Sequence, residues 1–338
     1  MANGDTTSSR LGQVNAADDA QALFLKVFSG EILTTFEEMN VMKDLHTVRT
    51  ISNGKSAQFP VTGIATAKYH TPGQNIADAG NSYLSQIKHA EKVINIDDLL
   101  VASTFISNID ELKNHYDVRS IYARELGKAL AKRFDLATMK TLVAAARSAT
   151  TITGGSAGIS QQGTFAGATP TAAELVAELF IAAQKLDEND IPNDGQRYAI
   201  LKPADYYTLL SSSEEIINRD FGGVGNVSNA TLPMAAGFRI YKSNHFADID
   251  VAEAAQDQDD DNARNDVFGG SGTGYNGDLS QSTIIGGHPS AVGTVKLLDL
   301  ATESDYKIEL QGTLFVAKYA MGHGVLRPEA SFEIKNDA

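Results

Sequence analysis

One stretch near the middle of the chain constrains its fold more than any other: residues 109–149 have the pattern of one uninterrupted helix. At ~1.5 Å rise per residue, such a helix is roughly 60 Å long. Apolar residues recur at steps of three, four and seven, which keeps them in one stripe of a 3.6-residue period. They are Leu112, Tyr116, Ala123, Leu126, Leu130, Phe134 and Ala137. A helix of this length without strict heptads predicts a strut on which other elements pack.

Two further lines of residues run along the same helix. The charged line on the opposite side consists of Lys113, Asp117, Arg124, Lys128, Lys132 and Asp135, and a second apolar line consists of Val118, Tyr122, Ala129 and Leu136. The second apolar line indicates that more than one element packs on the helix. Asn108 and Glu111 have the spacing of a capping box. Gly127 is the weak point of the helix and predicts a close approach of another backbone.

The composition excludes several classes of function. Of the 338 residues, 42% are hydrophobic and 21% charged, as in globular proteins. The absence of cysteine excludes disulfides and thiolate metal sites. A formal net charge of −14 argues against a dedicated DNA-binding protein. The sequence has no long apolar run and no signal-peptide core, so we expect a protein made and used in a cytoplasm-like setting.

A long hairpin is expected between residues 46 and 97, where the pattern changes to period two. Small or apolar residues alternate with polar ones from 56 to 67, which predicts a strand that Pro60 makes an edge strand or an irregular one. The chain returns through residues 86–96 after a polar turn region. The apolar face of this ribbon consists of Phe59, Val61 and Ala65. Because a two-stranded ribbon is marginal alone in water, we expect that face to need a partner.

The remaining segments form unequal blocks of helix and strand. Helices are expected at 22–39, 171–189 and 203–210, and strands at 197–201, 237–243, 282–285, 295–300, 307–319 and 331–334, the last three in an antiparallel sheet. Residues 1–19 are polar and predict an arm. Residues 248–266 hold eight acidic residues and one arginine, a charge of −7, and predict a solvated loop. Unequal blocks favour the α+β class.

One pattern typical of catalysis is the G-x-S-x-G sequence of Gly154–Gly158, which contains Ser156. A nucleophile elbow places this serine on a strand-to-helix turn, with a histidine and an acid downstream. Here the pattern follows the long helix within a loose segment of small residues, so we interpret it as a linker.

Other short patterns are incomplete. Asn53–Ser56 resembles the end of a phosphate loop but lacks its first glycine, and residues 222–225 lack the closing glycine of a dinucleotide fingerprint. Asp257, Asp259 and Asp261 match the start of a calcium loop whose later positions are absent, which leaves a weak cation site open. The seven histidines form no pair at metal-ligand spacing, and His323 between two glycines predicts a structural role. We therefore predict neither a catalytic residue nor a cofactor or metal.

Several blocks spread along the chain resemble the major capsid proteins of T-seven-like short-tailed phages. They are Ala22–Phe36, Ser52–Gly63, His89–Leu100, Asn114–Ser120, Ser290–Ala301 and Ala317–Ala330. Arg327–Ala330 (RPEA) also resembles the closing motif of the wider Hong Kong 97-type capsid fold. The resemblance is weakest in 150–190 and 248–279.

This resemblance implies an α+β, Hong Kong 97-like architecture. The expected parts are an N-terminal arm at 1–45, an E-loop at 46–97, a P-domain at 98–170 with a spine helix at 109–149, an A-domain at 171–292 and P-domain return strands at 293–338. The polar arm, the ribbon and the strut would each find their missing partner in neighbouring subunits. The implied self-assembly residues are Phe59, Val61, Ala65, Tyr69, Tyr83 and Leu84.

The implied function is that of a structural protein without enzymatic activity. Hexamers and pentamers would form the icosahedral head of a tailed phage, assembled in the host cytoplasm and found in the virion. The expected partners are further copies of the chain, a scaffolding protein and a portal, with enclosed double-stranded DNA bound without sequence specificity and no membrane. Two alternatives are an encapsulin-like compartment shell and a hydrolase that uses Ser156.

Overall fold

The structure, a computed structural model, places the chain in two compact units. It describes residues 32, 34–36, 40–63, 65, 67–78, 83–84, 87, 89–109, 118–150, 155–167, 169–212, 232, 234–246, 275, 279 and 281–336. Unit 1 contains Met1–Lys43, Asp98–Asp135 and Leu297–Met321, and unit 2 contains Asp44–Asp97, Leu136–Lys296 and Gly322–Ala338. The predicted arm, most of the helix at 22–39 and the acidic segment 248–266 lie outside the described residues.

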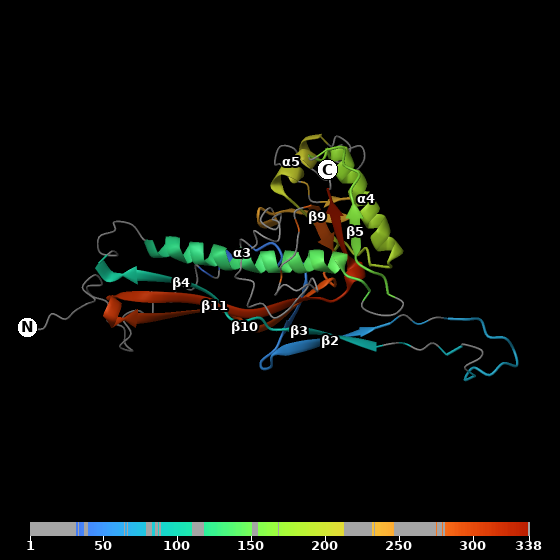
Figure 1. The fold of residues 1–338 in the computed structure, drawn as a ribbon, viewed down its shortest axis with the longest axis horizontal. Helices are drawn as coiled ribbons and strands as arrows, with labels where there is room; N and C mark the ends of the chain where they lie inside the picture. The colour runs from blue at the N-terminus through green and yellow to red at the C-terminus, as the bar shows by residue number, and fades with distance from the viewer. Residues whose placement is uncertain are drawn as a thin grey trace, which may run out of the picture. The chain divides into compact units, whose positions relative to one another are not determined.

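The long helix is confirmed as α3 (Val118–Arg147), while residues 110–117 lie outside the described residues (Figure 1). The predicted apolar stripe is buried at Ala123, Leu130 and Phe134 and half-buried at Leu126 and Ala137. From 138 to 146 every residue is buried, so the helix changes from a one-sided to a fully enclosed element along its length.

Two details of the helix prediction are wrong, and a third stays a prediction. Asp135, expected on the exposed charged side, is fully buried, and its carboxylate accepts hydrogen bonds from the backbone N–H groups of Val41 (3.0 Å) and Met42 (3.1 Å). The second apolar line is not a packing face, because Tyr122 is 40% exposed and Ala129 is exposed. The Asn108 side-chain amide donates to the Tyr306 hydroxyl (3.1 Å). Glu111 lies outside the described residues, so the capping box stays a prediction.

The core of unit 1 is built on aromatic side chains. Phe36, Phe134 and Tyr319 contact one another edge-to-face, with ring centroids 6.0–6.5 Å apart. Gly127 is required here, because a Cβ at this position would lie 2.9 Å from the carbonyl oxygen of Ile32. The close backbone approach predicted from this glycine is confirmed.

A four-stranded sheet has the order β1–β10–β11–β4. Its strands are β1 (Thr47–Thr50), β4 (Leu100–Ser107), β10 (Val292–Lys307) and β11 (Gly312–Val325), with the 3₁₀ turn η7 (Ile308–Leu310) between the last two. β11 and β4 pair antiparallel from Gly312↔Ser107 to Tyr319↔Leu100. The strands at 295–300 and 307–319 are confirmed in outline, whereas β1 and β4 were not predicted.

Unit 2 contains a six-stranded sheet in the order β5–β12–β9–β6–β8–β7. Its strands are β5 (Ile159–Gln162), β6 (Tyr198–Leu201), β7 (Met234–Ala235), β8 (Phe238–Lys242), β9 (Ser282–Gly287) and β12 (Ser331–Lys335), the last following η8 (Pro328–Ala330). Every residue of β6 and β9 is buried, which makes these strands the centre of the unit. The prediction that the last strand belongs to the terminal antiparallel sheet is wrong, because β12 pairs with β9 and, in parallel, with β5.

Two helices accompany this sheet, α4 (Ala172–Glu188) and α5 (Pro203–Ser212), close to the predicted bounds (Figure 1). Thr171 begins α4 with a complete capping box, in which Glu174 accepts from the Thr171 backbone N–H at 2.8 Å. α4 packs on α5 and on the sheet at β5 and β12. Thr171 and Glu174 therefore fix where the helix begins above the sheet.

The hairpin is confirmed as β2 (Ser56–Thr62) and β3 (His89–Asn95). They pair antiparallel from Ser56↔Asn95 to Thr62↔His89, so the register is continuous through Pro60. Gly54, at φ 122°, forms the bend that leads into β2.

Candidate functional site

The base of the hairpin is anchored in its own unit. Ala57 and Ile94 are buried in a cluster with Val295 and Leu326, and Phe59 packs against that cluster while partly exposed. Arg49 contacts strand β2 next to this cluster. Its guanidinium lies 5.6 Å from the centre of the Phe59 ring and donates to the Gln58 carbonyl oxygen at 2.6 Å. The partner expected for the apolar face is thus supplied within the chain in part at Phe59, next to the buried Ala57.

Exposure rises along the hairpin away from this anchor. Val61 is half-buried and Ala65 is exposed. Beyond them the large apolar side chains are mostly in solvent, with exposed fractions of 102% for Tyr69, 54% for Ile76, 61% for Leu84 and 48% for Ile87. Exposed apolar side chains grouped on one segment indicate a binding surface. We call residues 63–88 the hairpin tip.

Tyr83 differs from the other predicted interface residues because it organises the tip itself. Its hydroxyl donates to Gln74 Oε1 (2.5 Å) and accepts from the backbone N–H of Thr71 (2.9 Å). Hydrogen bonding to Thr71 lowers the pKa of Tyr83 below its ordinary value. The His70 ring lies 5.2 Å away, centroid to centroid. Tyr83 therefore holds the tip in shape, while Tyr69 and Leu84 supply exposed apolar surface.

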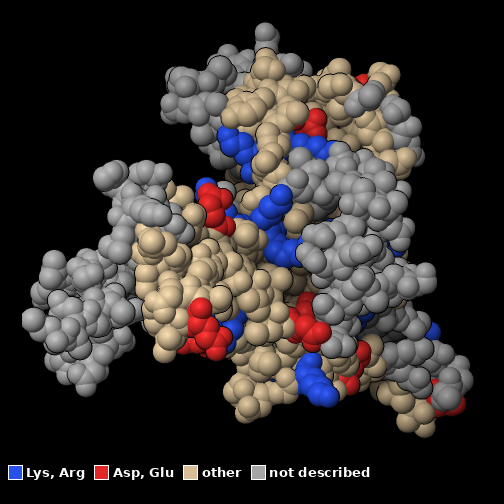
Figure 2. Space-filling view, turned by 60° about the vertical axis from the view of Figure 1, so that its left-hand side comes forward, with Lys and Arg blue, Asp and Glu red and all other residues tan. Residues whose placement is uncertain are grey.

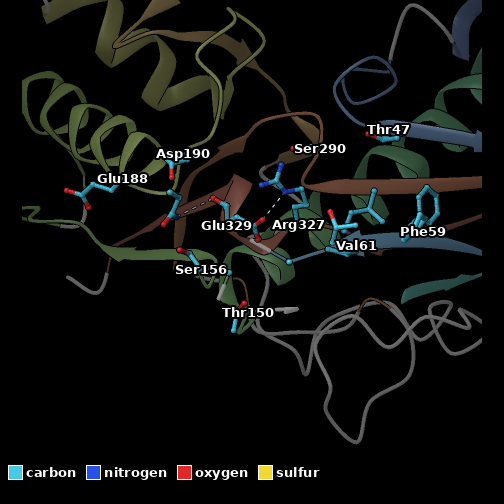
Figure 3. A pocket seen from close by; sticks show the side chains of 16 residues that line it. Thr47, Phe59, Val61, Thr150, Ser156, Glu188, Asp190, Ser290, Arg327 and Glu329 are labelled. Carbon is cyan, nitrogen blue, oxygen red and sulfur yellow. Dashed lines mark hydrogen bonds and ion pairs between the residues drawn. The ribbon is translucent and has the colours of Figure 1, made fainter. Parts of the chain in front are cut away.

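A hollow of about 470 Å³ lies beside the hairpin base (Figure 3). It is lined by Thr47, Phe59, Pro60, Val61, Thr62, Gly63, Thr150, Gly155, Ser156, Glu188, Asn189, Asp190, Ser290, Leu326, Arg327 and Glu329. Arg327 Nε donates to Glu329 Oε1 at 2.8 Å, and the Asn189 side-chain amide lies 3.4 Å from the Glu329 carbonyl oxygen. The RPEA motif thus links the end of α4 to the start of β12.

The hollow contains Ser156, but its setting is not that of a nucleophile. Ser156 is exposed and precedes a strand, β5, instead of beginning a helix. The described residues that line the hollow include no histidine. Next to it, Gly158 lets two backbones touch, since a Cβ there would lie 2.2 Å from the Ala145 carbonyl oxygen. This arrangement supports the linker interpretation and leaves the hydrolase alternative without a geometric basis.

His323 has the structural role expected of it. Its Nδ1 lies 2.8 Å from the Thr294 hydroxyl, and burial together with nearby His46 lowers its pKa to about 3. The flanking glycines allow β3 to pass close by, because a Cβ at Gly322 would lie 1.9 Å from the Asn95 carbonyl oxygen. Within the described ranges no group of three His, Asp or Glu side chains could hold a metal ion. Asn53–Ser56 leads into a strand, and residues 222–225 and 257–261 lie outside the described residues.

An ion pair that the sequence did not reveal, with one fully buried partner, ties the end of α3 to the six-stranded sheet. Glu333 on β12 is 0% exposed, and its two oxygens accept from Arg147 Nε (2.8 Å) and Nη2 (2.6 Å). Glu333 also accepts from the hydroxyls of Ser282 (2.5 Å) and Ser160 (3.3 Å), and Lys335 Nζ lies 3.9 Å from its Oε2. All these residues lie in unit 2, and we interpret the group as structural. Alternation along β12 alone could not have distinguished this glutamate from a solvent-facing one.

On the face drawn in Figure 2, charged side chains lie in small groups of both signs among uncharged residues. This described part of the surface shows no continuous basic field of the kind a dedicated nucleic-acid-binding protein needs. Among the described helices none is both long and apolar enough to cross a membrane.

Comparison with known proteins identifies the family to which the chain belongs. Residues 58–335 match the family model described as "Gp10A-like: Major capsid protein". The chain belongs to this family of major capsid proteins. It is 35% identical to the major capsid protein of Escherichia phage T7 over 98% of this chain and 97% of that one, and 34% identical to that of Enterobacteria phage T3 with the same coverage.

Solved structures agree with the family assignment. The capsid structure of cyanophage P-SCSP1u matches with a TM-score of 0.73 and 37% identity over 88% of both chains. The fold is therefore the Hong Kong 97-like capsid fold, as the resemblance implied. The family is one of structural capsid proteins, and its solved capsids imply self-assembly into a shell.

Proposed function

We propose that this chain forms the wall of a tailed-phage head, in which hexamers and pentamers close an icosahedral shell around double-stranded DNA. The observation that carries the proposal is the family match across residues 58–335, which includes both the anchored hairpin base and its exposed tip. A segment with Tyr69 wholly exposed and Leu84 61% exposed gains stability only when another surface covers it.

The parts of the chain fit the roles expected of such a subunit. The hairpin β2–β3 with its tip serves as the E-loop, and α3 as the spine helix of the P-domain. The six-stranded sheet with α4 and α5 serves as the A-domain, which extends the predicted range 171–292 by β5 and β12. The interface residues on the tip are Ala65, Tyr69 and Leu84, with Tyr83 holding their geometry. A scaffolding protein and a portal act as partners during assembly.

Electron microscopy of the purified, assembled protein tests this proposal. We expect closed shells of uniform diameter from the wild-type chain, with nucleic acid in particles recovered from infected cells. Particles that contain enzyme cargo and no genome would support a compartment shell instead. A chain that stays monomeric at all concentrations would contradict both.

A matched pair of variants tests the tip. Tyr69→Ser with Leu84→Ser should abolish closed particles, whereas Phe180→Ser, which removes a comparably exposed (59%) apolar side chain from α4, should leave them intact. Equal loss in both variants would show that the tip has no special part in assembly.

A further inference from the structure

The charge of the chain is distributed unevenly: the chain as a whole is acidic, whereas helix α3 is basic. The helix carries seven of the 28 Lys and Arg residues but only two of the 42 Asp and Glu residues, a formal charge of +5. The rest of the chain therefore sums to −19. This excess is local, so the net charge of −14 conceals it.

Only one of the two acidic residues of α3 lies on its exposed side. Asp135 is buried and accepts the Val41 and Met42 backbone N–H groups, so it faces away from solvent. Glu125 is exposed and pairs with Lys128 at 2.8 Å. Arg124, Lys128 and Lys132 are all exposed at four-residue spacing and therefore follow one another along the helix. We call these three residues the basic stripe.

We infer that the basic stripe is a contact site for the phosphate backbone of duplex DNA; this inference rests on the proposed function of a shell that encloses a genome. Four-residue steps place successive cations ~6 Å apart along the helix, ~12 Å in all. Each strand of duplex DNA carries a charge about every 3.4 Å, so a stripe of this length can meet two or three phosphates.

The hairpin tip of a second copy is a poorer occupant on grounds of charge. Residues 63–88 contain Lys68 and Lys88 against Asp78, a net charge of +1, so the tip does not complement a basic stripe. Phosphate contacts of this kind carry no sequence information and are weak for each subunit. Weak contacts repeated over the wall are compatible with DNA that must enter and leave the head.

The test measures the salt dependence of DNA binding. Full-length subunit, separated from particles by size-exclusion chromatography, is titrated into fluorescent 20-base-pair duplexes of two unrelated sequences at several NaCl concentrations. Since each neutralised phosphate contributes about −0.9 to the slope of log K against log salt, we expect a slope between about −1.8 and about −2.7 for two or three contacts, the smaller value if Lys128 stays paired with Glu125. Arg124→Gln with Lys132→Gln should reduce its magnitude to about 0.9 or less for both duplexes. The matched control, Lys55→Gln with Lys307→Gln, removes two exposed cations outside α3 and should leave it unchanged.

Several results would overturn the inference. They are no binding by the wild-type subunit at low salt, equal slopes for the wild type and the stripe variant, or equal loss in the control. Competition by polyglutamate as effective as by duplex DNA would assign the stripe to an acidic protein segment, such as residues 248–266 of another copy. Particle formation is scored separately by electron microscopy. Shells from the wild type and the control, but not from the stripe variant, would indicate a contact between copies, overturning this inference while leaving the proposed function intact.

Discussion

The six-stranded sheet of unit 2 and the hairpin tip represent opposite ways of using apolar residues. In the sheet, β6 and β9 are buried at every position, and even the charged Glu333 is enclosed and fully hydrogen-bonded. In the tip, Tyr69 is 102% exposed and Leu84 61% exposed, with local hydrogen bonds around Tyr83 as support. The difference suggests that the sheet stabilises the subunit and the tip serves contacts between subunits.

Substitutions should therefore separate into two classes. Changes around the sheet should lower the free energy of unfolding of the isolated subunit. Changes in the tip should leave that free energy unaltered and act on assembly alone.

The largest effect on stability is expected from Glu333→Ala. Removing the buried carboxylate leaves Arg147, whose side chain is 25% exposed, and two serine hydroxyls without their acceptor, and should cost about 2–3 kcal/mol. Urea denaturation followed by circular dichroism measures this loss. Glu303→Ala is the matched control, since Glu303 is 65% exposed in its pair with Lys318 and should cost at most about 1 kcal/mol. Equal costs for the two variants would show that the buried pair is not a determinant of stability.

A loss of stability of intermediate size is expected when the pH is lowered, because of His323. Above a pH of about 6.5 this histidine is neutral in both the folded and the unfolded chain. Below that value the unfolded chain binds a proton that the folded chain excludes until its pKa of about 3, so stability falls as pH falls. At ~1.4 kcal/mol per pH unit, about 2 kcal/mol is lost between pH 6.5 and pH 5.

Unfolding measured across that pH range checks this expectation. His323→Gln should flatten the pH dependence, whereas His89→Gln, at an exposed position of β3, should retain it. A slope that persists in His323→Gln would assign the acid sensitivity to other groups.

A smaller effect is expected from Thr171→Ala. This change removes the hydroxyl that caps the first turn of α4 and should lower the free energy of unfolding by about 1 kcal/mol. Thr208→Ala removes a hydroxyl that bonds the Ala204 carbonyl oxygen within α5, and should change stability by less than about 0.5 kcal/mol. Thermal melts of the two variants compare them directly, and indistinguishable melting temperatures would argue against the cap.

The smallest effect on stability is expected in the tip. Tyr69→Ser, Ile76→Ser and Leu84→Ser combined should change the free energy of unfolding by less than about 0.5 kcal/mol, because these side chains are already exposed. A loss of 2 kcal/mol or more in the isolated subunit would mean that the tip packs on its own chain, and the comparison with the sheet would fail.

The elements that the sequence predicted well have strong local patterns. The strut follows from helical spacing and the hairpin from alternation, and both are present as α3 and β2–β3. Gly127 correctly indicated a close backbone approach, because no side chain fits beside the Ile32 carbonyl oxygen.

The features that the sequence missed depend on distant partners. β5 lies in a segment rich in Thr, Gly and Ser, and becomes a strand because it pairs in parallel with β12, some 170 residues away. Asp135 fits an exposed pattern on the helix but is buried because two backbone N–H groups near residue 41 need an acceptor. Among the predicted interface residues, the exposure of Tyr69 and Leu84 could be expected because they flank a polar turn region. The packing of Phe59 against the core at the hairpin base could not be predicted from the sequence.

The most direct test of the account is deletion of Tyr69 to Leu84. We expect a soluble subunit with nearly unchanged helical circular dichroism, since α3, α4 and α5 lie outside the deletion. In sedimentation velocity it should form no closed particles, whereas replacing Glu253–Asp266 with a short Gly/Ser linker should leave particles intact. Normal shells from the Tyr69–Leu84 deletion would contradict the central claim that the hairpin tip holds the wall together.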